Sequence, residues 1–448
     1  MDNYNKKIIK LKNGIRLLVI PIKTKLTNIS IKILLGQQHE KKNEMELSHY
    51  LEHIMASFTS NKYKDSKLIK IELNKKGAET NAYVNDYESN FYIEGLYDDI
   101  EYYIDLLSNM LNNFYIDKNI VDVEKKAVIQ ELNNYMANPE YIFDLKIWKY
   151  MYYKYSYQID HELHIDFIKN YDPNDLYDYF KKHILLKNIL ISVTCPIDKR
   201  EHTIKLLKNA FNFKKNNKKY KIEYPVFNYK TSDIKLIYIN NKNNNINNSI
   251  LKIIISKNIL FNSPKHLSLI ILNTILFNFQ TGIFYEKLRR ELGLIYNINL
   301  SIFIDKYNSK SSYYSINSNI IYTKIPDLIT NIIKIFENID ITDEQIEYAK
   351  RKLVIDNEYN NFIGLNTYAS YYGQYILFDK KIIERSKNIE LFNKITNKDI
   401  QNELLNMRND IFNNSLFFYH CKKNMNNKIK IDLKNNNISH KIKYIDLN

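Results

Sequence analysis

The feature that most constrains the fold is an internal repeat: the second half of the chain presents the same kinds of segment as the first, in the same order. The clearest correspondence aligns Glu46-Leu-Ser-His-Tyr-Leu-Glu-His-Ile with His266-Leu-Ser-Leu-Ile-Ile-Leu-Asn-Thr. Residues 123–134 resemble residues 348–359, and a strand-like stretch closes each half, at 189–194 and 415–420. A repeat of this length predicts two domains with related folds.

Helical and strand-like patterns are mixed in both halves without strict βαβ alternation, which favours an α+β fold over a doubly wound sheet. Residues 213–221 are rich in lysine and asparagine and precede Pro225, as is typical of a linker. We therefore expect a domain over residues 1–212, a linker over 213–230 and a second domain over 231–448. Each domain should be an antiparallel or mixed sheet covered by helices.

Local patterns place the individual elements. The turn-forming pair Asn13-Gly14 predicts a hairpin over residues 8–19. The other expected strands are residues 29–35, 82–95, 188–194, 236–239, 250–255, 311–318 and 415–420. The expected helices are residues 65–75, 98–113, 119–136, 141–155, 173–183, 198–211, 266–277, 325–337 and 342–359, together with one around residue 50.

That helix around residue 50 carries the candidate chemistry. Its apolar residues recur with helical spacing, and positions three and four apart lie on one helix face, which brings His49, Glu52 and His53 together. Two imidazoles one turn apart suit zinc, and a carboxylate between them can act on a zinc-bound water. This is the H-x-x-E-H order of inverted zinc peptidases. The alternative is a helix face that carries these residues by chance.

A catalytic zinc site needs a third protein ligand. The best candidates are Glu124 and Glu131, which are seven residues apart and therefore share one face of the predicted helix over 119–136. Their spacing alone equally fits a charged helix face in contact with solvent. In the repeat, Leu269, Leu272 and Asn273 take the places of His49, Glu52 and His53, so only the first domain is equipped for metal chemistry.

Five motifs in order resemble the M16 peptidases, the family of pitrilysin, insulin-degrading enzyme and mitochondrial processing peptidase, in a two-domain, half-chamber form. The motifs are Leu11-Lys-Asn-Gly-Ile-Arg-Leu-Leu-Val19, His49-Tyr-Leu-Glu-His53, Gly77-Ala-Glu-Thr-Asn-Ala-Tyr83, Glu124-Lys-Lys-Ala-Val-Ile-Gln-Glu131 and Leu288-Arg-Arg-Glu-Leu-Gly-Leu-Ile-Tyr296. The resemblance covers nearly the whole chain.

The resemblance implies a role for each candidate residue. It implies one Zn²⁺ per chain, with Glu52 as the general base and Glu124 as a partner that orients a ligand. The implied zinc ligands are His49, His53 and Glu131. The implied substrate contacts are Asn81 and Ala82, on a strand edge that pairs with an extended peptide, and Arg289 and Tyr296 in the second domain.

The implied function is a zinc metalloendopeptidase that hydrolyses peptides or unfolded segments. The alternative is a non-catalytic scaffold or peptide-binding subunit of the same family. Because one chain is one half-chamber, the resemblance implies a homodimer, with a heterodimer with another such half as the second choice. The chain departs from the usual motifs at Gly36-Gln37, Glu46-Leu47-Ser48 and Thr59-Ser60, and we expect these differences to alter the substrate pocket more than the metal site.

Composition narrows the remaining choices. The net charge of +15 comes from lysines spread along the chain, without the clustering or motif of a nucleic-acid-binding protein, so no nucleic acid is expected as a partner. Cys195 and Cys421 are too few for a disulfide framework, and no signal peptide or membrane span is evident. We expect a cytoplasmic protein. His161 and His164 remain open as a second metal site or a polar loop or helix end.

Overall fold

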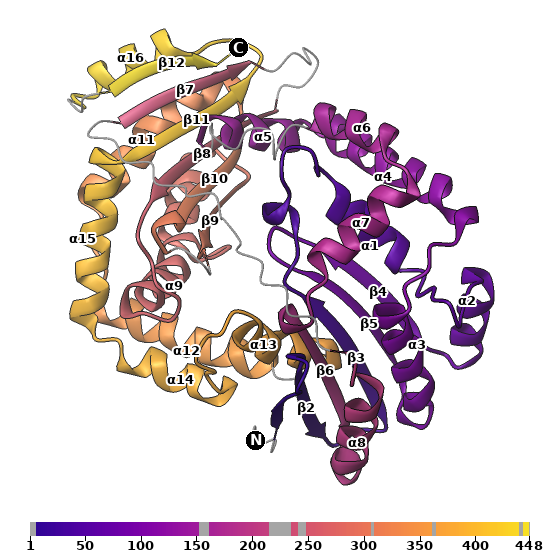
Figure 1. Ribbon diagram of the computed structural model, residues 1–448. Helices are drawn as coiled ribbons and strands as arrows, with labels where there is room; N and C mark the ends of the chain where they lie inside the picture. Colours follow the sequence, from indigo (N-terminus) through magenta and orange to yellow (C-terminus); the bar gives the residue numbers. More distant parts are fainter. Residues whose placement is uncertain are drawn as a thin grey trace. The chain divides into compact units, whose positions relative to one another are not determined.

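Figure 1 shows the computed structural model of the chain. It describes residues 6–151, 161–214, 234–240, 248–305, 309–360, 364–438 and 442–447. Most of the predicted linker over 213–230 therefore lies outside the described residues. None of the described helices is long and apolar enough to cross a membrane.

The first unit is built on a six-stranded sheet with the order β1-β2-β6-β3-β5-β4. Strands β2 and β6 are parallel and the other neighbours are antiparallel. The strands are β1 (Lys7–Lys10), β2 (Arg16–Ile22), β3 (Leu26–Ile33), β4 (Glu79–Val84), β5 (Ser89–Leu96) and β6 (Ile189–Pro196). The predicted hairpin around Asn13-Gly14 is confirmed, since β1 pairs with β2 across a turn in which Gly14 has a φ of 102°.

The second unit repeats this arrangement with the order β12-β7-β11-β8-β10-β9. Strands β7, β11, β8, β10 and β9 take the places of β2, β6, β3, β5 and β4, including the parallel pair, so the predicted repeat is confirmed. The strands are β7 (Ile234–Asn240), β8 (Asn248–Ser256), β9 (Asn297–Phe303), β10 (Tyr313–Ile321), β11 (Ser415–Cys421) and β12 (Ile442–Leu447).

Helices cover both sheets, as the α+β prediction requires (Figure 1). The first unit contains α1 (Leu47–Met55), α2 (Ser66–Lys75), α3 (Ile100–Asn112), α4 (Lys118–Ala137), α6 (His161–Asn170), α7 (Pro173–His183), α8 (Arg200–Ala210) and α13 (Leu365–Leu377). The second contains α5 (Pro139–Met151), α9 (Pro264–Phe277), α10 (Ile283–Tyr285), α11 (Ile325–Asn338), α12 (Asp343–Asn360), α14 (Arg385–Lys394), α15 (Asn397–Asn413) and α16 (Asn426–Asn435).

The two compact units are not contiguous in sequence, unlike the predicted domains 1–212 and 231–448. Helix α5 comes from the first half but belongs to the second unit, and α13 comes from the second half but belongs to the first. Strands of the second sheet are apolar on both faces, and α5 covers one face by packing Phe143 and Ile147 against Ile254 and Phe418. Helical periodicity predicts an apolar face but not which sheet that face covers. The exchange of α5 and α13 between the units could therefore not be predicted from the sequence.

One predicted strand, over residues 82–95, is instead the hairpin β4–β5. Its turn contains no glycine. The side chain of Asn85 closes it by accepting hydrogen bonds at 2.9 Å from the backbone N–H groups of Tyr87 and Glu88. Cys195 and Cys421 are buried at equivalent places in β6 and β11, and burial raises the pKa of both thiols to about 11.

Candidate metal centre

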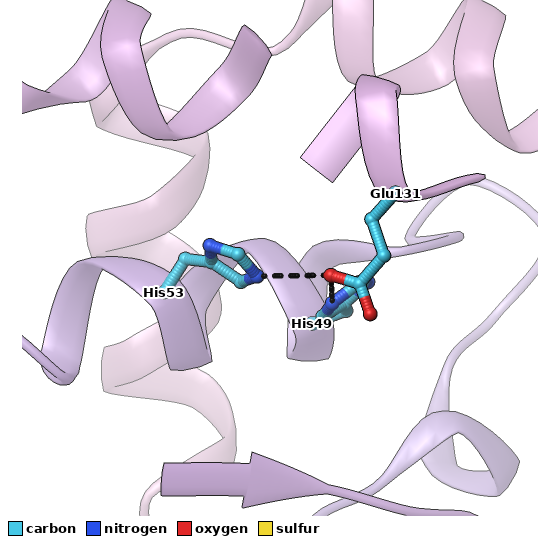
Figure 2. A group of neighbouring side chains, drawn as sticks. All are labelled: His49, His53 and Glu131. Carbon is cyan, nitrogen blue, oxygen red and sulfur yellow. Dashed lines mark ion pairs between the residues drawn. The ribbon is translucent and has the colours of Figure 1, made fainter. Parts of the chain in front are cut away.

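Three side chains from two helices converge in the first unit. His49 and His53 project from one face of α1, and Glu131 reaches toward them from α4, which packs against α1 (Figure 2). One oxygen of Glu131, Oε2, lies 3.5 Å from Nε2 of His49 and 3.6 Å from Nε2 of His53. The ligand atoms of the three residues all lie within 4.8 Å of one another.

A second set of hydrogen bonds fixes the orientation of these three side chains. Nδ1 of His49 lies 2.9 Å from Glu46 Oε2, and Nδ1 of His53 lies 3.1 Å from Glu124 Oε2. Since a carboxylate accepts, Nδ1 carries a proton in each ring, and loss of any second proton leaves the lone pair of Nε2 facing the common centre. The hydroxyl of Tyr135 donates to the other oxygen of Glu131 at 2.6 Å.

Burial and hydrogen bonding shift the pKa values of the cluster. Burial disfavours a charge on His49, but the hydrogen bond and charge of Glu46 outweigh it and raise the pKa of His49 to about 8. Burial raises the pKa of Glu52 against the attraction of His53 and His49. Burial acts upward on Glu131 too, yet the hydrogen bond from Tyr135 and the nearby imidazoles lower its pKa.

The donor set fits zinc. Two imidazole nitrogens and one carboxylate oxygen form a ligand set known from catalytic zinc sites, which keep a fourth position open. Two donors at about 2.1 Å from a tetrahedral ion are about 3.4 Å apart. The two separations between Nε2 and Oε2, 3.5 and 3.6 Å, are close to that value. Among the residues that the structure describes, this is the one group of three or more His, Cys, Asp or Glu residues with ligand atoms so close together.

Comparison with known proteins identifies the family. Residues 18–159 match the family model described as Insulinase (Peptidase family M16), and residues 170–353 match the one described as Peptidase M16 inactive domain. The chain belongs to the M16 peptidase family.

Individual M16 proteins resemble the chain over different lengths. Mitochondrial-processing peptidase subunit beta of Dictyostelium discoideum is 25% identical over 30% of this chain and 28% of its own length. An uncharacterized zinc protease of Rickettsia felis is 24% identical over 34% and 36%. The chain thus spans about a third of the curated relatives it matches. A protease from Helicobacter pylori has the same fold, with a TM-score of 0.76 and 15% identity over 93% of this chain and 99% of that one.

The M16 chain places its predicted substrate contacts in different units. Asn81 and Ala82 lie on β4, the last strand of the first sheet, and α1 packs against this strand. Arg289 and Tyr296 lie in the second unit. The guanidinium of Arg289 donates to the carbonyl of Tyr296 at 2.9 Å and lies 4.5 Å from the centre of its ring, while the Tyr296 side chain extends into solvent.

The buried residues that surround His49 were not predicted from the sequence. Of the alternatives for His164, the helix end agrees with the structure: it is buried in the first turn of α6, and its Nδ1 lies 2.8 Å from Glu46 Oε1. Glu40 accepts the backbone N–H groups of Glu46 and Ser48 at 2.9 and 2.8 Å. Burial and the charge of Glu46 raise the pKa of Glu40 to about 8. The side chain of His161 lies outside the described residues.

This network also corrects the expectation for the motif departures. Glu46 and Ser48 were expected to alter the substrate pocket, yet both side chains turn inward, toward His49 and Glu40 respectively. At the departure Gly36-Gln37, Gly36 itself approaches the β4–β5 turn so closely that an added Cβ would lie 2.1 Å from the carbonyl oxygen of Asn85. The role of Glu46 could not be predicted from the sequence, because a single glutamate before a helix forms no spacing pattern.

Proposed function

We propose that this chain is a zinc-dependent metalloendopeptidase that hydrolyses peptides or unfolded segments, with one zinc per chain. The observation that carries the proposal is the convergence of Nε2 of His49, Nε2 of His53 and Oε2 of Glu131, with both Nδ1 atoms turned to carboxylates. In this proposal the three converging residues hold the ion, and Glu124 keeps His53 in the ligating tautomer.

A zinc ion held there would supply Lewis-acid chemistry, acidifying a water molecule and stabilising negative charge on the peptide carbonyl. Glu52 is the general base: it takes a proton from that water and passes it to the leaving amine. Its position on α1 between the two histidines suits this role, and burial, by raising its pKa, makes it a better proton acceptor. Only the ionised carboxylate can accept, and the neighbouring imidazoles favour that form.

The substrate is proposed to be an extended peptide that pairs with the outer edge of β4. Within the described part of the chain, β4 pairs with β5 on one side only, so its other edge offers backbone donors and acceptors beside Asn81 and Ala82. An exposed edge next to α1 would hold a peptide bond near Glu52. Backbone pairing recognises any extended segment, which favours unfolded substrates over folded ones.

The second unit is proposed to act in trans. In a homodimer, Arg289 and Tyr296 of one copy would contact the peptide bound at the zinc of the other; a heterodimer with another M16 half is the second choice. Size-exclusion chromatography with light scattering, combined with a peptidase assay, tests this. A chain that is fully active as a strict monomer would contradict it. The buried, unpaired Cys195 and Cys421 suit the reducing cytoplasm, which is our proposed location.

The decisive experiment measures zinc content and cleavage of a mixed peptide library by four proteins: the wild type, Glu52→Gln, Glu131→Gln and Glu72→Gln. Glu52→Gln should keep one zinc per chain and lose cleavage by at least about 100-fold, since it removes the base and no ligand. Glu131→Gln should lose zinc and cleavage. Glu72→Gln, on the outer face of α2, should lose neither.

Two outcomes would reject the proposal. Undiminished cleavage by Glu52→Gln would contradict the mechanism. A wild type that binds zinc but cleaves no member of the library would favour the alternative, a non-catalytic scaffold or peptide-binding subunit.

A further inference from the structure

Glu46 has an unusual backbone conformation for its residue type. It precedes α1 with φ 67° and ψ 3°, in the left-handed region, where a residue with a Cβ is disfavoured. It is also completely buried, although glutamate is among the residues least often found inside a protein. A strained, buried carboxylate persists only where the surrounding contacts compensate for both costs, and such residues gather at functional sites.

The contacts of Glu46 supply that compensation. Its oxygens are divided between two imidazoles, with Oε2 at 2.9 Å from Nδ1 of His49 and Oε1 at 2.8 Å from Nδ1 of His164. Its backbone N–H donates to Glu40 at 2.9 Å. Both imidazoles therefore donate to one carboxylate, and His164 holds the oxygen that His49 does not contact.

We propose that Glu46 is a positioning residue for the metal ligand His49, and that His164 of α6 anchors it. This inference rests on the proposed zinc-dependent function. Glu46 accepts the Nδ1 proton of His49, which leaves the lone pair on Nε2 and aims it at Oε2 of Glu131. Glu124 on α4 accepts the Nδ1 proton of His53 in the same way. Glu124 is partly exposed, whereas Glu46, the partner of His49, is buried.

The chain offers a matched control for this proposal. Glu44 is a second buried carboxylate of the same loop, and it pairs with Lys182 and, at 3.4 Å, with His183 rather than with a ligand histidine. Replacing Glu44 by glutamine disturbs a buried carboxylate–histidine pair close in sequence to Glu46. It leaves the hydrogen bond between Glu46 and His49 in place.

The experiment measures zinc affinity by competition with a chromophoric chelator, without any peptide substrate. Glu46→Gln should weaken zinc binding by about 10- to 100-fold, because the amide accepts from one imidazole and turns N–H donors toward the other. Glu44→Gln should leave the affinity within about threefold of the wild type.

Two further variants keep the proposal testable if Glu46→Gln fails to fold. His164→Asn retains an N–H donor near the position of Nδ1 and should bind zinc like the wild type, whereas His164→Leu removes the donor and should bind several-fold more weakly. If His164 served only to stabilise the fold, retaining this one N–H donor in His164→Asn would not restore zinc affinity relative to His164→Leu.

The outcomes separate this inference from the proposed function. Wild-type affinity in Glu46→Gln or His164→Leu, with zinc lost in Glu131→Gln, would overturn the inference and leave the function standing. An equal loss in Glu44→Gln would assign the effect to the loop as a whole and overturn it too. A wild type that takes up no zinc would overturn both.

Discussion

Helices α1 and α9 follow equivalent strands, β3 and β8, of two sheets with the same strand order, yet they carry different side chains on the same face. In α1 one face carries His49, Glu52 and His53, and its two imidazoles converge with Glu131. In α9, Leu269 and Leu272 at the first two positions are fully buried in the hydrophobic core of their unit, and Asn273 donates to the carbonyl of Leu300 at 3.3 Å. The first unit thus has candidate metal ligands at helix positions where the second unit has a buried leucine and an asparagine.

The partner helices repeat the contrast. Helix α4 packs on α1 and provides Glu124 and Glu131, whereas α12 packs on α9. In the register that aligns residues 123–134 with 348–359, the counterparts are Ala349, which is buried, and Asp356, which pairs with Lys352 of its own helix at 2.5 Å. At these aligned positions, therefore, the second unit has neither the two imidazoles nor a carboxylate that converges on α9.

The largest expected effect comes from giving α1 the residue of α9. His53→Asn removes one of three ligands and should weaken zinc binding by about 1,000-fold, since the about 10–16 kcal/mol of a zinc site shared over three ligands is roughly 4 kcal/mol each. Chelator competition measures this. A loss below tenfold would show that His53 is not a ligand.

The converse exchange tests the cost of the catalytic groups. Leu272→Glu places an unpaired carboxylate in the core and should destabilise the second unit by about 3 kcal/mol. Glu52→Leu should stabilise the zinc-free protein by about 1 kcal/mol while abolishing hydrolysis, because burial already disfavours the charge of Glu52. Urea unfolding of both variants measures this. Equal destabilisation by the two would contradict the comparison.

The residue aligned with Glu46 gives a pH-dependent test. His266 lies in the first turn of α9, is buried, and accepts the N–H of Asn262 through Nδ1 at 3.0 Å. Burial lowers its pKa to about 4. The unfolded chain protonates this histidine from about pH 6.5 and the native protein only near 4, so its contribution is complete above 6.5 and is lost as the pH falls toward 4.

The expected loss from His266 is about 2 kcal/mol at pH 5. In His266→Asn the Oδ1 atom can still accept the N–H of Asn262 and has no proton to gain, so the stability of the variant should fall less between pH 7 and 5. His420, whose pKa burial also lowers to about 4, remains as a common background in both proteins. Urea unfolding at the two pH values measures the difference, and identical pH dependence would contradict the assignment.

The comparison also shows what sequence can and cannot reveal. The repeat, the α+β class and the helix carrying His49 and His53 follow from periodicity, since a 3.6-residue period and a turn signal are local properties. The exchange of α5 and α13 between units does not, because which sheet an apolar helix covers is decided by distant strands. Nor does the role of His164, which lies 118 residues from Glu46, its hydrogen-bond partner.

The smallest expected effect concerns Tyr135, which donates a hydrogen bond to the candidate ligand Glu131. Tyr135 follows Glu131 by one helical turn and holds its Oε1, so that Oε2 faces the two imidazoles. Tyr135→Phe removes one solvent-exposed hydrogen bond, worth about 1 kcal/mol, and should weaken zinc binding by about fivefold without loss of the fold. Chelator competition, with Tyr102→Phe on the distant helix α3 as the control, resolves a change of this size. An effect as large as that of His53→Asn would mean that Tyr135 does more than orient Glu131, and the cluster would then need a fourth member.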